Sequence, residues 1–144
     1  MRRRIALIVA TGLSVLAAGC GGGSGPPEPP PIDPAVIEQG KAIFRFDTFG
    51  DETQWTDTLR MHEVIRTAVD PTTALSVGLK VDADALPAAV VQGIRNGSVD
   101  LKSPDTTVTL LKLDAVVGLK GTVETINGKD TLTRVGITCA LCHS

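Results

Sequence analysis

The segment that most constrains how this chain can fold is residues 21–31, which read GGGSGPPEPPP. Glycine and serine followed by closely spaced prolines cannot build a core, and this composition is typical of a flexible linker. We therefore assign residues 20–32 to a linker that begins with Cys20. The stretch that follows, residues 33–144, is long enough for one small globular domain.

The residues before the linker have the layout of a secretory signal peptide. Arg2, Arg3 and Arg4 precede an apolar run over residues 5–16, and small residues lead to Cys20. The apolar run is shorter than the roughly 20 residues that a membrane-spanning helix needs, so we favour a cleaved signal over residues 1–19 and keep an uncleaved helix as the alternative.

The residues Leu16-Ala17-Ala18-Gly19-Cys20 resemble the lipobox of bacterial lipoproteins, with the leucine one position further back than usual. The resemblance implies that Cys20 is lipidated and that the protein is anchored at the periplasmic face of a membrane in the cell envelope. Gly21 after the cysteine favours the outer membrane. An ordinary signal peptide with a free Cys20 is the alternative.

The charge of the chain argues against nucleic acid as a partner. Its 14 basic and 16 acidic residues nearly balance, and the body contains no basic patch. Three cysteines are also too few for a fold stabilised by disulfides. Membrane attachment through Cys20 therefore remains as the expected interaction here, and other partners have to be inferred from the sites.

Apolar residues at steps of three and four predict four short amphipathic helices in the domain. Residues that commonly start or stop helices bound them, such as Asp33 and Pro34 before the first and Gly97 after the third. The predicted ranges are residues 34–46, 53–69, 84–96 and 103–117.

The pattern changes near the end of the chain, where residues 121–126 and 132–138 are rich in valine, isoleucine and threonine. They flank Asn127 and Gly128, the strongest hairpin signal in the sequence. We therefore predict a mainly α fold, a small helical domain in which one β-hairpin leads directly into Cys139.

The run Cys139-Ala140-Leu141-Cys142-His143 is a C-x-x-C-H motif, the attachment sequence for c-type haem. In a helical turn, residues three and four apart project toward one side. Two thiols can then add to the haem vinyl groups, while the imidazole reaches the iron as an axial ligand. Haem c is the predicted cofactor.

Three other uses of the motif remain open. Cys139, Cys142 and His143 could form a zinc site together with His62, the only other histidine. The two cysteines could instead form a thiol–disulfide centre or a local structural disulfide.

Several segments resemble a family of exported bacterial c-type cytochromes: GKAIFRFDTFGDE (residues 40–52), WTDTLRMHE (55–63), ALSVGLKVD (74–82), LLKLDAVVG (110–118) and VGITCALCHS (135–144). The resemblance implies a cytochrome c-like domain over residues 33–144, with Cys139 and Cys142 as thioether sites and His143 as the proximal iron ligand. In such proteins the chain continues past the motif, so we expect this domain to be incomplete at its C-terminus.

The candidates for the distal iron ligand are His62 and Met61. His62 lies on the apolar stripe of the predicted second helix and points inward, whereas Met61 is rotated about 100° from it. Core packing is the alternative role for both residues, and the favoured role for Trp55, Phe44, Phe46 and Phe49.

An electron-transfer cytochrome is the leading functional hypothesis. One alternative is a subunit of a periplasmic peroxidase-like haem enzyme, in which an open iron position binds peroxide or oxygen. Another is a non-haem lipoprotein that binds zinc or acts as a scaffold.

Overall fold

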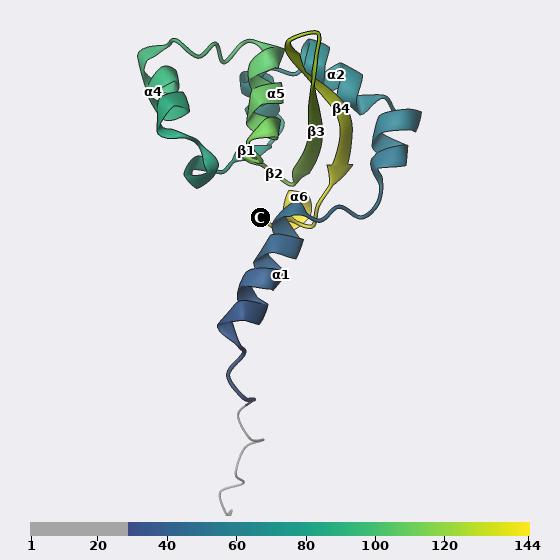
Figure 1. Ribbon diagram of the computed structural model, residues 1–144, viewed down its shortest axis with the longest axis vertical. Coiled ribbons are helices and arrows are strands. Elements are labelled where there is room, and N and C mark those ends of the chain that lie inside the picture. The colour runs from purple at the N-terminus through teal and green to yellow at the C-terminus, as the bar shows by residue number, and fades with distance from the viewer. Residues whose placement is uncertain (1–28) are drawn as a thin grey trace, which may run out of the picture. The chain divides into compact units, whose positions relative to one another are not determined.

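The computed structural model describes residues 29–144 (Figure 1). The predicted signal peptide, Cys20 and most of the linker lie outside the described residues. Residues Ile32–Ser144 form one compact unit. No helix in residues 29–144 is long and apolar enough to cross a bilayer.

The first helix, α1 (Pro34–Phe46), begins and ends where the sequence predicts. The Asp33 side chain accepts a hydrogen bond of 2.9 Å from the Ala35 amide, and Pro34 occupies the first helical position, where its missing N–H costs nothing. The helix ends at Asp47, which is extended.

The single helix predicted over residues 53–69 is wrong, because two shorter helices occupy this range. A π-helical segment, η1 (Thr53–Thr58), is followed by α2 (Met61–Ala68). Arg60, between them, has a φ of 53°, a left-handed conformation that stops the first helix. Thr56 in η1 exchanges hydrogen bonds with both backbone groups of Val135, and these contacts hold η1 against the hairpin.

The next elements include two that the sequence analysis missed. Helix α3 (Pro71–Ser76) starts at Asp70, whose carboxylate accepts a 2.8 Å hydrogen bond from the Thr73 amide. Strand β1 (Lys80–Val81) pairs antiparallel with β2 (Val116–Val117).

Two predicted helices are present in shortened form. A 3-10 turn, η2 (Ala83–Ala85), precedes α4 (Ala88–Asn96), which ends at Gly97 as predicted. Helix α5 (Pro104–Lys112) stops before the predicted residue 117, because Val116 and Val117 are in β2 instead.

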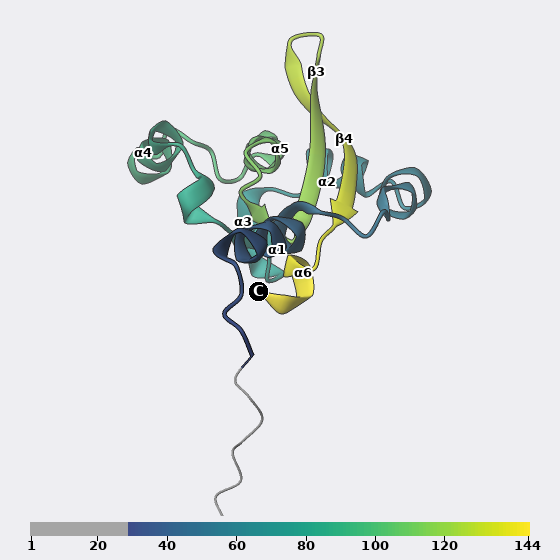
Figure 2. The ribbon, with the colours of Figure 1, turned by 60° about the horizontal axis from the view of Figure 1, so that its bottom comes forward.

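The predicted hairpin is confirmed. Strands β3 (Leu119–Ile126) and β4 (Lys129–Ile137) pair antiparallel, with one irregularity after Thr122. Asn127 and Gly128 have φ values of 53° and 80°, the two positive values that a type I′ turn requires. In Figure 2 this turn lies at the far end of the hairpin from α6 (Ala140–His143).

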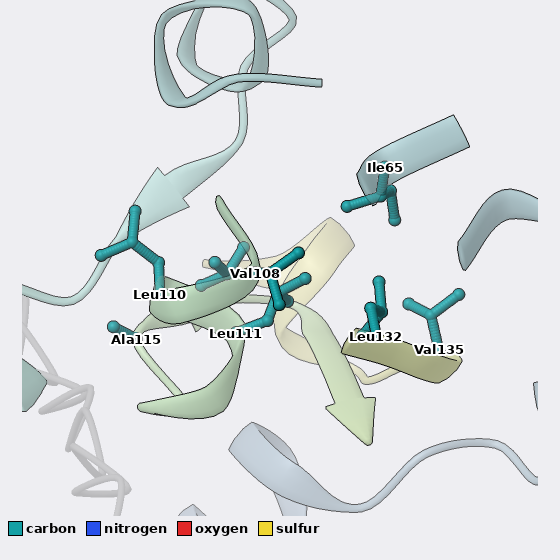
Figure 3. Close-up of a cluster of buried hydrophobic side chains, with 8 residues drawn as sticks. Ile65, Val108, Leu110, Leu111, Ala115, Leu132 and Val135 are labelled. Atoms are coloured by element: carbon teal, nitrogen blue, oxygen red, sulfur yellow. The ribbon is translucent and has the colours of Figure 1, made fainter. Parts of the chain in front are cut away.

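The core lies between α2, α5 and the hairpin (Figure 3). Ile65 from α2, Leu111 from α5, and Leu132 and Val135 from β4 are its central side chains, and Leu132 is completely buried. The domain is rich in helix and contains the expected hairpin, but the β1–β2 pair makes it a mixed α/β fold rather than a plainly mainly α one.

Candidate functional site

The C-x-x-C-H residues form a single helical turn directly after the hairpin. Cys139 precedes the short helix α6 (Ala140–His143), and the Leu141 amide donates a 3.1 Å hydrogen bond to the Thr138 carbonyl. Thr138 and Ala140 are completely buried, so the start of the turn is fixed in the protein body. The predicted delivery of the motif by the hairpin is therefore confirmed.

Gly118 holds this turn in place through a close backbone contact. A Cβ atom added to Gly118 would lie 2.3 Å from Leu141 Cα, a distance that no side chain tolerates. The Thr138 amide also donates a 3.0 Å hydrogen bond to the Gly118 carbonyl. Its positive φ of 90° favours glycine, but no neighbouring residue indicates the contact with Leu141.

The reactive side chains of the motif project away from the body. Cys139 is partly buried, Cys142 and His143 are exposed, and neither thiol is in a disulfide. At about 100° per residue, these three side chains fall within an arc of about 100° on one side of the turn. This arrangement leaves both thiols accessible to a bulky electrophile and the imidazole beside them, which fits covalent haem attachment.

Leu141 projects to the opposite side of α6, into an apolar cavity of about 290 Å³. The cavity is also lined by Trp55, Met61, Leu79 and Leu119. Because Leu141 is two positions from both Cys139 and His143, the cavity and the reactive side chains lie on different faces of the turn. A group bound to the two thiols would therefore lie on the outer face of α6, away from this cavity.

The two distal-ligand candidates lie side by side at the start of α2. Met61 lines the apolar cavity and packs against the core, whereas the sequence analysis had turned it away from the inward-facing His62. The His62 side chain is 17% exposed, with its Nε2 3.9 Å from a Glu63 carboxylate oxygen. The inward orientation predicted for His62 is confirmed by its low exposure, whereas Met61, predicted to point away, packs inward as well.

No cluster of three or more histidine, cysteine, aspartate or glutamate side chains within residues 29–144 is arranged to hold a metal ion. The four-ligand zinc arrangement of Cys139, Cys142, His143 and His62 is thus not assembled.

Core packing, the role expected of the aromatic residues, is confirmed for Trp55 but not for Phe46 and Phe49. Trp55 is partly buried against the core, and its Nε1 donates a 2.8 Å hydrogen bond to Asp51. Phe46 and Phe49 are 40% and 68% exposed, so core packing is wrong for these two residues. The other Asp51 oxygen accepts a 3.1 Å hydrogen bond from the Ile137 amide, which ties η1 to the end of β4 just before the motif.

Comparison with protein-family models, with curated proteins and with solved structures found no match.

Proposed function

We propose that this chain is an exported c-type cytochrome that carries one haem on α6 and transfers electrons. One observation supports the proposal above the others: Cys139, Cys142 and His143 lie on the same outward face of one rigid turn, with both thiols unpaired. A zinc site would need a fourth ligand beside them.

In this proposal the residues of α6 have separate tasks. Cys139 and Cys142 would hold the haem covalently through thioether bonds, and the His143 imidazole would bind its iron. The bound haem supplies an iron that cycles between the ferric and ferrous states.

The surroundings of α6 determine where these side chains point. Gly118 and the buried Thr138 fix the backbone of the turn, so the imidazole needs little reorientation. Because Cys142 and His143 are exposed in residues 29–144, a group held by them would lie at the surface of this part of the chain, where a redox partner could reach it.

Expression of the full chain in a host with haem-attachment machinery tests the proposal. The parent should show a haem-stained band on a denaturing gel and bind one iron per chain. Cys139→Ala and Cys142→Ala should each weaken the band and shift the spectrum of the pyridine complex, because one vinyl group stays unreacted.

The two histidines provide a matched control for iron ligation. His143→Ala should change the visible spectrum strongly, whereas His62→Ala should leave covalent attachment intact. One zinc per chain, or no metal at all in the parent, would contradict the haem assignment.

We further propose that Cys20 is lipidated and holds the protein at the periplasmic face of a membrane. Two or three acyl chains on one residue give a stable anchor, at about 0.8 kcal/mol per buried CH₂ group. Cys20→Ser should release the protein into the soluble periplasmic fraction. Retention of Cys20→Ser in the membrane would instead favour an uncleaved helix over residues 5–16.

A further inference from the structure

The chain contains two asparagines, Asn96 and Asn127, and a glycine follows each of them. An asparagine before glycine readily loses its side-chain amide, because glycine has no Cβ to obstruct attack by its own backbone nitrogen on the asparagine side chain. Both asparagines are exposed to solvent. Exposure therefore does not separate the two sites, and any difference between them must come from the local structure.

Hydrogen bonds hold the site at Asn96, where α4 ends. The Asn96 side-chain oxygen accepts a 3.0 Å bond from the Ser98 amide. The Gly97 amide, whose nitrogen would have to attack, donates a 3.3 Å bond to the Ile94 carbonyl. The attacking nitrogen and the attacked side chain are therefore both engaged, and the end of the helix has to open before they can react.

The site at Asn127, at the tip of the β3–β4 hairpin, lacks these restraints. Within residues 29–144, neither the Asn127 side chain nor the Gly128 amide takes part in a hydrogen bond. The last pair of the ladder is Ile126 with Lys129, so both turn residues lie outside it. Asn127 also has a φ of 53°, which is unfavourable for a residue with a Cβ, so leaving this conformation costs less than opening a helix end.

We propose that Asn127 is a site of spontaneous deamidation in the folded protein, and that Asn96 is protected. The Gly128 nitrogen forms a bond to Asn127 Cγ, the Cγ–Nδ2 bond breaks, and the amide leaves as ammonia with the Gly128 proton. Water then opens the cyclic imide at either of its carbonyls. The product at position 127 is an aspartate or an isoaspartate, and water is the only other reactant.

The two products affect the hairpin differently. Aspartate before glycine also favours a type I′ turn, so this product keeps the fold and adds a negative charge. Isoaspartate carries an extra methylene group in the main chain, and it lengthens a turn that the pairing of Ile126 with Lys129 holds to two residues. In either product the new carboxylate is two positions from Lys129, which pairs with Asp105 at 3.0 Å. The hairpin tip therefore becomes more acidic as the protein ages.

Incubation of the folded full chain in mildly alkaline buffer, followed by trypsin digestion and mass spectrometry, tests the proposal. Cleavage after lysine and arginine places the two asparagines in separate peptides, residues 96–102 and 121–129. In the folded chain, position 127 should convert at least tenfold faster than position 96, because a factor of ten in rate is about 1.4 kcal/mol in the barrier, close to the net strength of one hydrogen bond. In concentrated urea the two positions should convert at similar rates, because glycine follows both.

Two glutamine variants are the matched controls. Asn127→Gln should abolish labelling of the aged, folded protein by an isoaspartate methyltransferase, because glutamine must close a larger ring and reacts far more slowly. Asn96→Gln should be labelled like the parent. An unmodified position 127, a rate ratio below tenfold in the folded chain, the same ratio in urea, or labelling that survives Asn127→Gln would overturn the proposal. The readout is the same with or without haem on α6.

Discussion

Replacing Gly118 by alanine should destabilise the domain and displace the C-x-x-C-H turn. The φ of Gly118 is 90°, and an alanine held in such a conformation costs about 1–3 kcal/mol. The new Cβ would also lie 2.3 Å from Leu141 Cα and 2.6 Å from Leu141 N, and forced overpacking of this kind costs a further ~1–3 kcal/mol. The sum, about 2–6 kcal/mol, is a large part of the ~5–15 kcal/mol that stabilises a typical domain.

Gly78→Ala separates the two contributions. Gly78 has a similar φ of 94°, but a Cβ atom there meets nothing within 4 Å. Urea unfolding followed by the fluorescence of Trp55, the only tryptophan, gives the free energy of unfolding of both variants. In protein made without haem, Gly118→Ala should lose more stability than Gly78→Ala, or its Cys139 thiol should react faster with a thiol reagent because α6 has moved. Equal unfolding free energies together with an unchanged rate of thiol reaction would refute the close contact between Gly118 and α6.

Two further predictions concern stability. In the urea assay, Thr56→Val should lower the free energy of unfolding by about 1–3 kcal/mol, because it leaves the N–H and the carbonyl of Val135 without their Thr56 partner. Thr107→Val is the control: its buried hydroxyl has no partner among the described residues, so this variant should be neutral or stabilising. Hydrogen bonds, chiefly from the Thr72 hydroxyl, lower the pKa of Asp70 from 3.8 to about 2. The ionised Asp70 carboxylate therefore stabilises the folded state above pH 3.8, and this stabilisation is lost as the pH falls toward 2. The parent should therefore be more stable than Asp70→Ala near pH 6, with a gap in thermal midpoint that narrows between pH 4 and pH 2; a constant gap would contradict the pKa shift.

The elements that the sequence predicted well are those decided by neighbouring residues. Asp33 starts α1 by accepting a hydrogen bond from the Ala35 amide, and Pro34 supplies a fixed φ at the first helical position. All three residues are neighbours in sequence. Asn127 and Gly128 set the hairpin because few other pairs adopt two successive positive φ values. The spacing of the C-x-x-C-H motif likewise indicated that Cys139, Cys142 and His143 would share one side of a helical turn, and these residues do form such a turn.

Other features depended on partners far along the chain. Val116 and Val117 fit a helical period, yet they form β2 because Lys80 and Val81 pair with them. The helix predicted over residues 53–69 breaks at Arg60 while Thr56 bonds to Val135 in β4. Periodicity weighs only nearby residues, so it could not anticipate either pairing.

The sequence by itself determined the chemistry available at the end of the chain: two thiols and one imidazole at helical spacing after a hairpin. Only the tertiary structure decided which way they face. Gly118 fixes α6 by a contact with Leu141, and this contact turns Leu141 to the apolar cavity and leaves Cys142 and His143 exposed. The direction of the site follows from the close packing of two backbone segments distant in sequence, which no local pattern of residues encodes.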